Sequence, residues 1–272
     1  MNGDELMYIK VVPCLCERMT NWNVVGIFTA VDMSENRTGN APPVLGPEIY
    51  SPWRASRLGC ITESLEENLL LELVGDPKGL DVLDVGCGDG DLAFSLAESG
   101  ACVVGVDPSE GMIDKAREMA ELRNSTATFQ CDEGESLSFD EARFDLVLAK
   151  TILCFVDDAP MVFSEMARVL RPNGRLVIGE LGRWSFWALQ RYIRGRFGSR
   201  LWRRGNSWTS AQLRTMAEDA GFTVTEIRGS VFYPRWAFAA RVMSRFDEPL
   251  GRMTTFGAAF IAMAATKDGF AS

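Results

Sequence analysis

A cluster of glycines and acidic residues follows a short apolar segment in the first third of the chain. Residues 82–90 read VLDVGCGDG, with glycines at positions 86, 88 and 90. Glycine lets the backbone turn tightly and lets a ligand approach closely, because no Cβ stands in the way. A strand that opens into such a loop and then into a helix is typical of a site for a nucleotide-like ligand.

Two kinds of ligand compete for this loop. A dinucleotide site requires the pattern G-x-G-x-x-G, whose third glycine would fall at position 91, where the chain has Asp91. The positive end of a helix dipole attracts phosphate, whereas Asp89 and Asp91 would repel it. The loop therefore favours a ligand without phosphates, and an NAD-dependent oxidoreductase stays open as the less favoured alternative.

The chain contains no histidine, and this absence limits its chemistry. It excludes a histidine general base, a histidine-containing triad and a histidine-ligated metal, so we expect no metal site. The net charge of −9 argues against a nucleic-acid partner, because binding phosphates requires a basic surface.

Apolar periodicity predicts alternating strands and helices around the loop. Helical spacing predicts an amphipathic helix over 62–74, whose other face carries Glu63, Glu66 and Glu67. Apolar runs predict strands at 80–85, 101–106, 126–131, 144–149, 175–181, 222–227 and 256–265, with helices at 92–98, 109–123, 159–170 and 209–220. This alternation predicts a parallel, doubly wound α/β sheet.

The loop resembles the D-x-G-x-G-x-G signature of class I S-adenosylmethionine-dependent methyltransferases, in the type 11 group similar to the ubiquinone/menaquinone-biosynthesis enzymes. Three further blocks follow in that family's order: VVGVDPSEGM at 103–112, FDLVLAKTILCF at 144–155 and VLRPNGRLVIGE at 169–180. The resemblance implies a Rossmann-like sheet of seven mostly parallel strands with a C-terminal antiparallel strand and helices on both faces. It also implies in-line methyl transfer from S-adenosylmethionine to a small-molecule acceptor.

The resemblance assigns the cofactor's amino-acid end to the loop and to the fourth strand. Asp84 would lie near the amino group, and Lys150 would offer its backbone to the same end. The methionine part would be lined by the loop residues Gly86, Cys87, Gly88 and Gly90.

The nucleoside end of the cofactor is assigned in the same way. Asp107 would accept both ribose hydroxyls, which suits a carboxylate with two acceptor oxygens. Pro108 and Met112 would pack near the adenine. An acid after the third strand would receive the adenine amine; Glu133 aligns better than Asp132, but both qualify, and the candidates here are Asp132, Glu133 and the following Gly134.

The acceptor side is less defined. Methyl transfer from a sulfonium is an in-line displacement, so holding the acceptor close in a dry pocket supplies much of the acceleration. A thiol or carbon acceptor needs little help, whereas an alcohol or phenol usually needs its proton removed. The acceptor atom (O, N, S or C) therefore stays open, as does the base, for which the candidates are Glu180, Asp157, Asp158, Tyr233 and Cys154.

Residues 183–208 contain seven arginines, four tryptophans and no acidic residue. Their place after the fifth strand predicts a cap or lid insertion over 182–208. Such a lid would enclose an apolar, aromatic or anionic acceptor, or contact a membrane surface peripherally. The alternative, an amphipathic helix pair with buried tryptophans and solvated arginines, stays open.

The remaining segments bound the domain. Residues 1–45 show no sustained period, so we expect a poorly ordered N-terminal arm and a methyltransferase domain over 46–272. No apolar run is long enough to span a bilayer, and the seven cysteines lack paired spacing. We therefore expect a cytoplasmic protein with reduced thiols and no transmembrane segment. A non-catalytic cofactor-binding or interaction protein on the same fold stays open, and the sequence does not predict the oligomeric state.

Overall fold

The computed structural model of the chain describes residues 52–197 and 205–269. The N-terminal arm expected over 1–45 lies outside the described residues, and so does part of the expected cap, between residues 197 and 205. The domain boundaries therefore stay a prediction.

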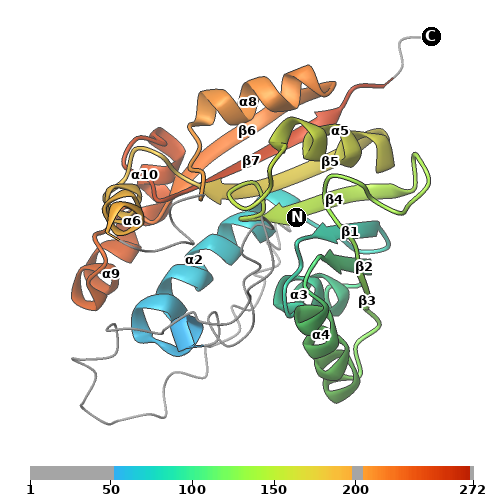
Figure 1. Ribbon diagram of the computed structural model, residues 1–272, viewed down its shortest axis with the longest axis horizontal. Coiled ribbons are helices and arrows are strands. Elements are labelled where there is room, and N and C mark those ends of the chain that lie inside the picture. Colours follow the sequence, from blue (N-terminus) through green and yellow to red (C-terminus); the bar gives the residue numbers. More distant parts are fainter. Residues whose placement is uncertain (1–51, 198–204, 270–272) are drawn as a thin grey trace, which may run out of the picture. The chain divides into compact units, whose positions relative to one another are not determined.

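Seven strands form one sheet in the order β3-β2-β1-β4-β5-β7-β6 (Figure 1). The strands are β1 (Asp81–Val85), β2 (Cys102–Asp107), β3 (Thr128–Cys131), β4 (Phe144–Lys150), β5 (Leu170–Leu181), β6 (Phe222–Ser230) and β7 (Phe260–Lys267). Strands β1 to β5 pair in parallel, and β7 is antiparallel to both β5 and β6. The expected mostly parallel seven-stranded sheet with a C-terminal antiparallel strand is confirmed.

Helices cover both faces of the sheet (Figure 1). They are α2 (Arg57–Val74), α3 (Asp91–Glu98), α4 (Glu110–Arg123), α5 (Ala159–Val169), α6 (Phe186–Arg196), α8 (Ser210–Asp219), α9 (Ala237–Met243), the 3-10 helix η2 (Ser244–Phe246) and α10 (Asp247–Met253). Leu70 of α2, Phe94 of α3 and Ile113 of α4 belong to one buried core. Phe163 of α5 and Leu213 of α8 belong to the other. Each face of the sheet is thus covered by its own layer.

Helix starts follow the capping residues in the sequence. Ser109 caps α4, and Asp158 caps α5 by accepting a hydrogen bond from the backbone N of Met161 at 3.0 Å. Thr209 and Gln212 form a capping box at the start of α8. Local chemistry therefore sets these boundaries.

The segment between β6 and β7 differs from the expectation. The sequence predicted a strand from residue 256 and no helix before it, whereas α9, η2 and α10 fill this segment and β7 begins at Phe260. Gly257 has a φ of +89°, which interrupts extended backbone ahead of the strand. Helices α9 and α10 have seven residues each, which is about two turns, so their apolar residues do not repeat often enough to reveal a helical period in the sequence.

The cysteines within residues 52–197 and 205–269 divide into two groups. Cys60 in α2 is disulfide-bonded, whereas Cys87, Cys102, Cys131 and Cys154 are free thiols. The expectation of reduced cysteines therefore holds for these four and is wrong for Cys60. The cytoplasmic location stays a prediction. Within residues 52–197 and 205–269, no helix has the length and apolar character needed to cross a membrane.

Candidate functional site

A cavity of about 480 Å³ lies where the strand order reverses, at the carboxyl ends of β1, β2 and β4. In open α/β sheets, ligands bind at this topological switch point. The register brings the glycine loop and the end of β2 together, because Val85 pairs with Val106, so Gly86 leaves β1 at the level of Asp107, the last residue of β2. The volume is of the size that holds a small-molecule ligand.

The three loop glycines are required for different reasons. Gly86, Gly88 and Gly90 have φ values of +72°, +56° and +88°, which disfavour other residues. A Cβ on Gly86 would lie 2.1 Å from a methyl carbon of Ile152, and a Cβ on Gly90 would lie 2.8 Å from the ring of Phe129. A Cβ on Gly88 would meet no atom within 4 Å, because this residue borders the cavity. Gly88 thus leaves space that a ligand can use.

Asp107 links the loop to the end of β2. Its Oδ2 accepts a hydrogen bond from the backbone N of Gly88 at 3.1 Å, and its Oδ1 accepts one from Ser109 at 2.9 Å. Burial raises the pKa of Asp107, and these two backbone donors oppose that effect. The carboxylate is therefore held in a fixed orientation on the cavity wall, with lone pairs remaining on both oxygens.

Asp84 lies at the floor of the cavity and is only 2% exposed. Its Oδ2 has no hydrogen-bond partner among the described residues. Burial raises the pKa of Asp84 to about 7, the charge of Asp107 adds to this effect, and Lys150 opposes it. A buried carboxylate oxygen without a hydrogen-bond partner is costly, and a ligand ammonium group would satisfy it. The residues therefore fit a ligand with a cationic amino group.

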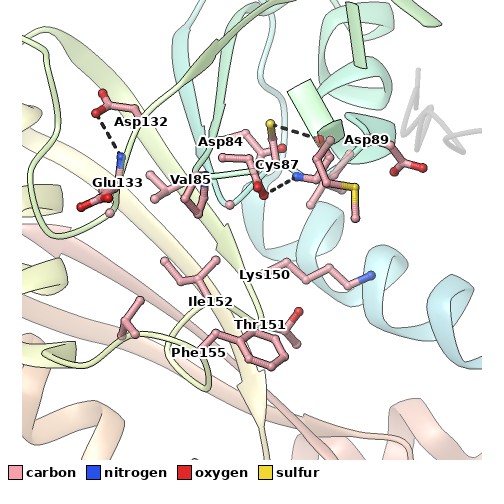
Figure 2. A pocket seen from close by; sticks show the side chains of 18 of the residues that line it. Asp84, Val85, Cys87, Asp89, Asp132, Glu133, Lys150, Thr151, Ile152 and Phe155 are labelled. Carbon is pink, nitrogen blue, oxygen red and sulfur yellow. Dashed lines mark hydrogen bonds between the residues drawn. The ribbon is translucent and has the colours of Figure 1, made fainter. Parts of the chain in front are cut away.

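The two candidate acids after β3 lie in different surroundings. Asp132 accepts hydrogen bonds from the backbone N of Glu133 at 3.0 Å and from the backbone N of Ser138 at 2.8 Å. Figure 2 shows the Asp132 carboxylate turned to the Glu133 backbone. Both residues line the cavity. Both oxygens of Asp132 hold its own loop, whereas the carboxylate of Glu133 accepts no hydrogen bond from the described residues.

The acids at the start of α3 are neutralised by cations that the sequence did not reveal. Arg54 donates to both oxygens of Asp89 at 2.7 and 2.9 Å and also pairs with Asp91. Lys115 lies 3.2 Å from Asp89, and Arg123 lies 3.1 Å from Asp91. Burial would raise the pKa of Asp89, but Arg54 and Lys115 hold it below its usual range. The two acids are therefore committed to ion pairs.

A second cluster of charges borders the cavity on the side of α2. The Nζ of Lys150 lies 2.6 Å from Glu63, 3.5 Å from Glu66 and 3.8 Å from Glu67. Burial raises the pKa of Glu66 to about 8 against the effect of Lys150, and it also raises the pKa of Glu67. Figure 2 shows the Lys150 side chain running toward α2. The acidic face of the predicted amphipathic helix thus packs beside the cavity, with Glu63, Glu67 and Lys150 in its lining.

The candidate bases from the sequence are dispersed. Asp157 lines the cavity, whereas Glu180, Tyr233 and Cys154 do not belong to the described lining. Asp158 is engaged as the N-cap of α5. The structure therefore brings one of these five residues to the cavity.

The other three candidates are buried in structural contacts. Glu180 is 0% exposed and accepts a hydrogen bond from the backbone N of Leu153 at 2.7 Å, and burial raises its pKa to about 8. The hydroxyl of Tyr233 lies 3.0 Å from that of Thr62, and burial raises the pKa of Tyr233. Burial also raises the pKa of Cys154 well above its usual value. These groups support the loop after β4 and the packing of α2.

Fold and cavity together define a Rossmann-like α/β protein with a nucleoside-type site at the switch point. The family model for a methyltransferase domain matches residues 82–174. A ubiquinone biosynthesis O-methyltransferase of Coxiella burnetii (strain RSA 493 / Nine Mile phase I) is 32% identical over 162 residues, which cover 58% of this chain and 69% of the relative. The ubiquinone biosynthesis O-methyltransferase of Rhodopseudomonas palustris (strain HaA2) is 34% identical over 172 residues, which cover 60% of this chain and 67% of that relative.

Solved structures show the same fold. A methyltransferase from Thermotoga maritima, described as a possible histamine N-methyltransferase, superposes with a TM-score of 0.63 at 22% identity, covering 81% of this chain and 95% of that one. Magnesium protoporphyrin IX methyltransferase from Synechocystis PCC 6803, with bound S-adenosylhomocysteine, gives 0.58 at 22% identity, covering 78% and 86%.

The chain therefore belongs to the S-adenosylmethionine-dependent methyltransferase family. It is an enzyme that uses S-adenosylmethionine to methylate a small-molecule acceptor, as the resemblance implied. The relatives support this activity in preference to the oxidoreductase and non-catalytic alternatives.

Proposed function

We propose that the enzyme transfers the methyl group to a hydroxyl of an apolar, aromatic small molecule. The unpartnered carboxylate oxygen of Asp84 in the cavity carries the cofactor half of this proposal. The names of the relatives, ubiquinone biosynthesis O-methyltransferases, support oxygen as the acceptor atom. The side chains of Ile152, Phe155 and Val156 in the cavity lining support an apolar acceptor.

The cofactor supplies an electrophilic methyl group on a sulfonium, and the chain binds and orients it. We assign Asp84 to the amino group and Asp107 to the ribose hydroxyls. Glu133, rather than Asp132, is assigned to the adenine amine, because the carboxylate of Asp132 is occupied by its own loop. The remaining assignments follow the family pattern and the cavity lining: Gly86, Cys87, Gly88, Gly90, Pro108, Met112, Gly134 and Lys150.

The acceptor's proton requires a base on the other side of the cavity. Three carboxylates of α2 lie there. Glu63 is the one most strongly engaged by Lys150, at 2.6 Å, and Glu66 does not belong to the described lining of the cavity, so neither is suited to be the base. Glu67 lies 3.8 Å from Lys150, lines the cavity and has a raised pKa. A carboxylate made more basic in this way is suited to take the proton of a hydroxyl. We assign Glu67 as the general base in preference to Asp157, which also lines the cavity but is exposed to solvent.

Replacing Glu67 by glutamine should lower kcat by about 100- to 10,000-fold, the usual contribution of a general base. Affinity for S-adenosylmethionine should change little, because the cofactor contacts lie elsewhere. In the unchanged enzyme at saturating S-adenosylmethionine, kcat/KM for the acceptor should rise with pH through the raised pKa of Glu67, and the variant should lose this dependence. The measurement is transfer of a radiolabelled methyl group to phenols and catechols that carry alkyl chains.

Glu72→Gln is the matched control, because Glu72 lies on the same helix but pairs with Arg228 and Arg252 away from the cavity. Its kcat should equal that of the unchanged enzyme. Equal activity of Glu67→Gln would remove Glu67 from this role. Transfer to thiols or amines alone would contradict oxygen as the acceptor atom.

Replacing Asp107 by alanine should weaken binding of S-adenosylmethionine by about 1 to 3 kcal/mol, the scale for losing a hydrogen bond to a charged group. Calorimetric titration with S-adenosylmethionine, S-adenosylhomocysteine and NAD in parallel is the measurement. Asp114→Ala, which removes an exposed carboxylate of α4, should leave affinity unchanged. Unchanged affinity of Asp107→Ala would remove Asp107 from the site, and binding of NAD alone would overturn the whole assignment.

A further inference from the structure

Helix α6 exposes its apolar side chains. Trp187, Arg191 and Gly195, spaced four residues apart, form the buried stripe. Phe186 is 75% exposed and Phe197, just after the helix, is 88% exposed. Between them Leu189, Tyr192 and Ile193 are also exposed, at the spacing of one helical face. An arginine is thus buried while the apolar face meets solvent, the reverse of an ordinary surface helix.

The segment between β6 and β7 exposes aromatic side chains in the same region. Trp236 and Phe238, at the start of α9, are 70% and 80% exposed, and Phe246 and Phe256 are exposed as well. The chain around Phe256 is joined to the start of the cap, because the backbone N of Gly257 donates to the carbonyl of Trp184 at 2.9 Å. Trp184 is itself exposed.

Direct contacts join the two segments into one surface. The Arg235 guanidinium lies 4.8 Å from the centre of the Trp187 ring, and the indole N–H of Trp187 donates to the carbonyl of Tyr233 at 2.7 Å. Figure 1 shows α6, α9 and α10 gathered at one end of the sheet. We call this region the aromatic–arginine surface; its exposed aromatic members are Trp184, Phe186, Tyr192, Phe197, Trp236, Phe238, Phe246 and Phe256.

The charge of this surface is mostly positive: α10, between Phe246 and Phe256, adds the exposed Glu248, which pairs with Arg252, and the buried Asp247. Residues 182–197 and 231–246 contain seven arginines and no acidic residue, although the whole chain has a net charge of −9. Arg183, Arg196, Arg241 and Arg245 are exposed. A group of exposed apolar side chains in one region marks an interaction site, and the arginines favour a partner that also carries negative charge.

We infer that the aromatic–arginine surface docks onto an anionic phospholipid bilayer. Aromatic side chains on exposed helices, interspersed with arginines, are suited to the boundary between lipid headgroups and acyl chains. The arginines would contact the phosphate groups while the aromatic rings enter the interface. The surface spans α6 and the β6–β7 segment, and therefore extends beyond the arginine-rich run of the cap.

Docking has a consequence for the acceptor, and this consequence rests on the proposed function. α6 follows the carboxyl end of β5, and the 231–246 segment follows that of β6. The cavity lies at the carboxyl ends of β1, β2 and β4, which run in the same direction. The surface therefore lies at the same edge of the sheet as the cavity, so a bound enzyme can take an apolar acceptor from the lipid phase.

Co-sedimentation of the full chain with vesicles tests this inference. The chain should bind vesicles of an equal mixture of phosphatidylcholine and phosphatidylglycerol, and bind phosphatidylcholine alone at least about tenfold more weakly, because each basic residue near an anionic surface contributes to binding. High salt should weaken the binding. Equal binding to both vesicle types, or binding to neither, would overturn the inference.

Paired substitutions locate the binding surface. Phe186→Ser with Phe197→Ser should reduce vesicle binding by about tenfold or more, because two exposed rings are lost from the interface. Leu122→Ser is the matched control, since Leu122 is 69% exposed on α4, on a different part of the fold. Arg241→Gln with Arg245→Gln should weaken binding to anionic vesicles, whereas Arg214→Gln on α8 should not.

Titration with S-adenosylmethionine separates this inference from the proposed function. Every variant should bind the cofactor as the unchanged chain does. If the phenylalanine variant binds vesicles normally while retaining cofactor binding, the surface does not dock lipid. If it instead abolishes self-association measured by ultracentrifugation, with no vesicle binding by the unchanged chain, the surface joins copies of this chain and the lipid inference is wrong. Failure of cofactor binding in the unchanged chain would overturn the proposed function alone.

Discussion

Replacing Gly88 by valine should abolish binding of S-adenosylmethionine while leaving the far-UV circular dichroism near native. No atom lies within 4 Å of a Cβ at this position, so the fold has room for a side chain. That room is the cavity itself, and a branched side chain there would occupy the space of the ligand. Calorimetric titration should detect no binding.

The backbone contributes a separate effect that needs its own control. Gly88 has a φ of +56°, where a residue with a Cβ costs about 1 to 2 kcal/mol. Gly221 has a φ of +84° and equally open surroundings, but it lies in the turn between α8 and β6, outside the cavity lining. Gly221→Val should therefore lose similar stability and keep full cofactor affinity. Retained binding by Gly88→Val would show that the loop is not the site.

Replacing Asp84 by asparagine should have opposite effects on binding and on stability. Affinity for S-adenosylmethionine should fall by about 1.5 to 3 kcal/mol, because the ammonium group loses a charged partner. Above pH 7 the free energy of unfolding of the ligand-free protein should rise, because a buried carboxylate with an unpartnered oxygen is replaced by a neutral group. Titration calorimetry and thermal unfolding at several pH values measure the two effects.

The same residue predicts how cofactor binding depends on pH. Burial raises the pKa of Asp84 to about 7 in the free protein, and a bound ammonium group would lower it. Below pH 7 binding must therefore release a proton, so affinity should rise with pH up to this point, by at most about tenfold per unit. It should fall again once the ligand's α-amino group loses its own proton, near about pH 8.

Asp84→Asn should lose the acidic limb of this profile and keep the alkaline one. Proton release on binding, measured by calorimetry in buffers of different ionisation enthalpy, should disappear in the variant. An unchanged acidic limb would assign the titration to another group and remove the role proposed for Asp84. If Asp84→Asn were less stable than the unchanged protein at high pH, the Oδ2 of Asp84 would have to form a stabilising interaction in the native protein, contrary to its assignment as an unpartnered oxygen.

Sequence reasoning predicted the glycine loop and the acids beside it because these features are local. A strand, a tight turn and a helix follow one another within a few residues, and the pattern predicts each of them. Parallel pairing then places the ends of β1 and β2 at one level, so Asp107 meets Gly88 once the sheet type is known. The order of strands and helices similarly predicted the sheet, because a parallel connection requires a crossover.

Periodicity could not predict which surface each polar face would meet. The acidic face of α2 showed the expected helical spacing, but only the tertiary structure placed Glu67 and Lys150 at one cavity wall. From the sequence, Asp89 is interpreted as unfavourable for phosphate, but its pairing with Arg54 spans 35 positions and leaves no trace in the local pattern. Such pairs depend on how distant elements pack.

The sequence by itself determined the fold class, the family and the residues of the glycine loop. These depend on local turn geometry, capping and the order of elements, which are encoded in consecutive residues. The tertiary structure decided that, of the two acids lining the cavity, Asp132 is engaged by its own loop, and that α6 exposes its apolar face. Each of these outcomes depends on which groups long-range packing brings within contact distance. Without the tertiary structure, two adjacent residues with the same chemistry, such as Asp132 and Glu133, cannot be distinguished.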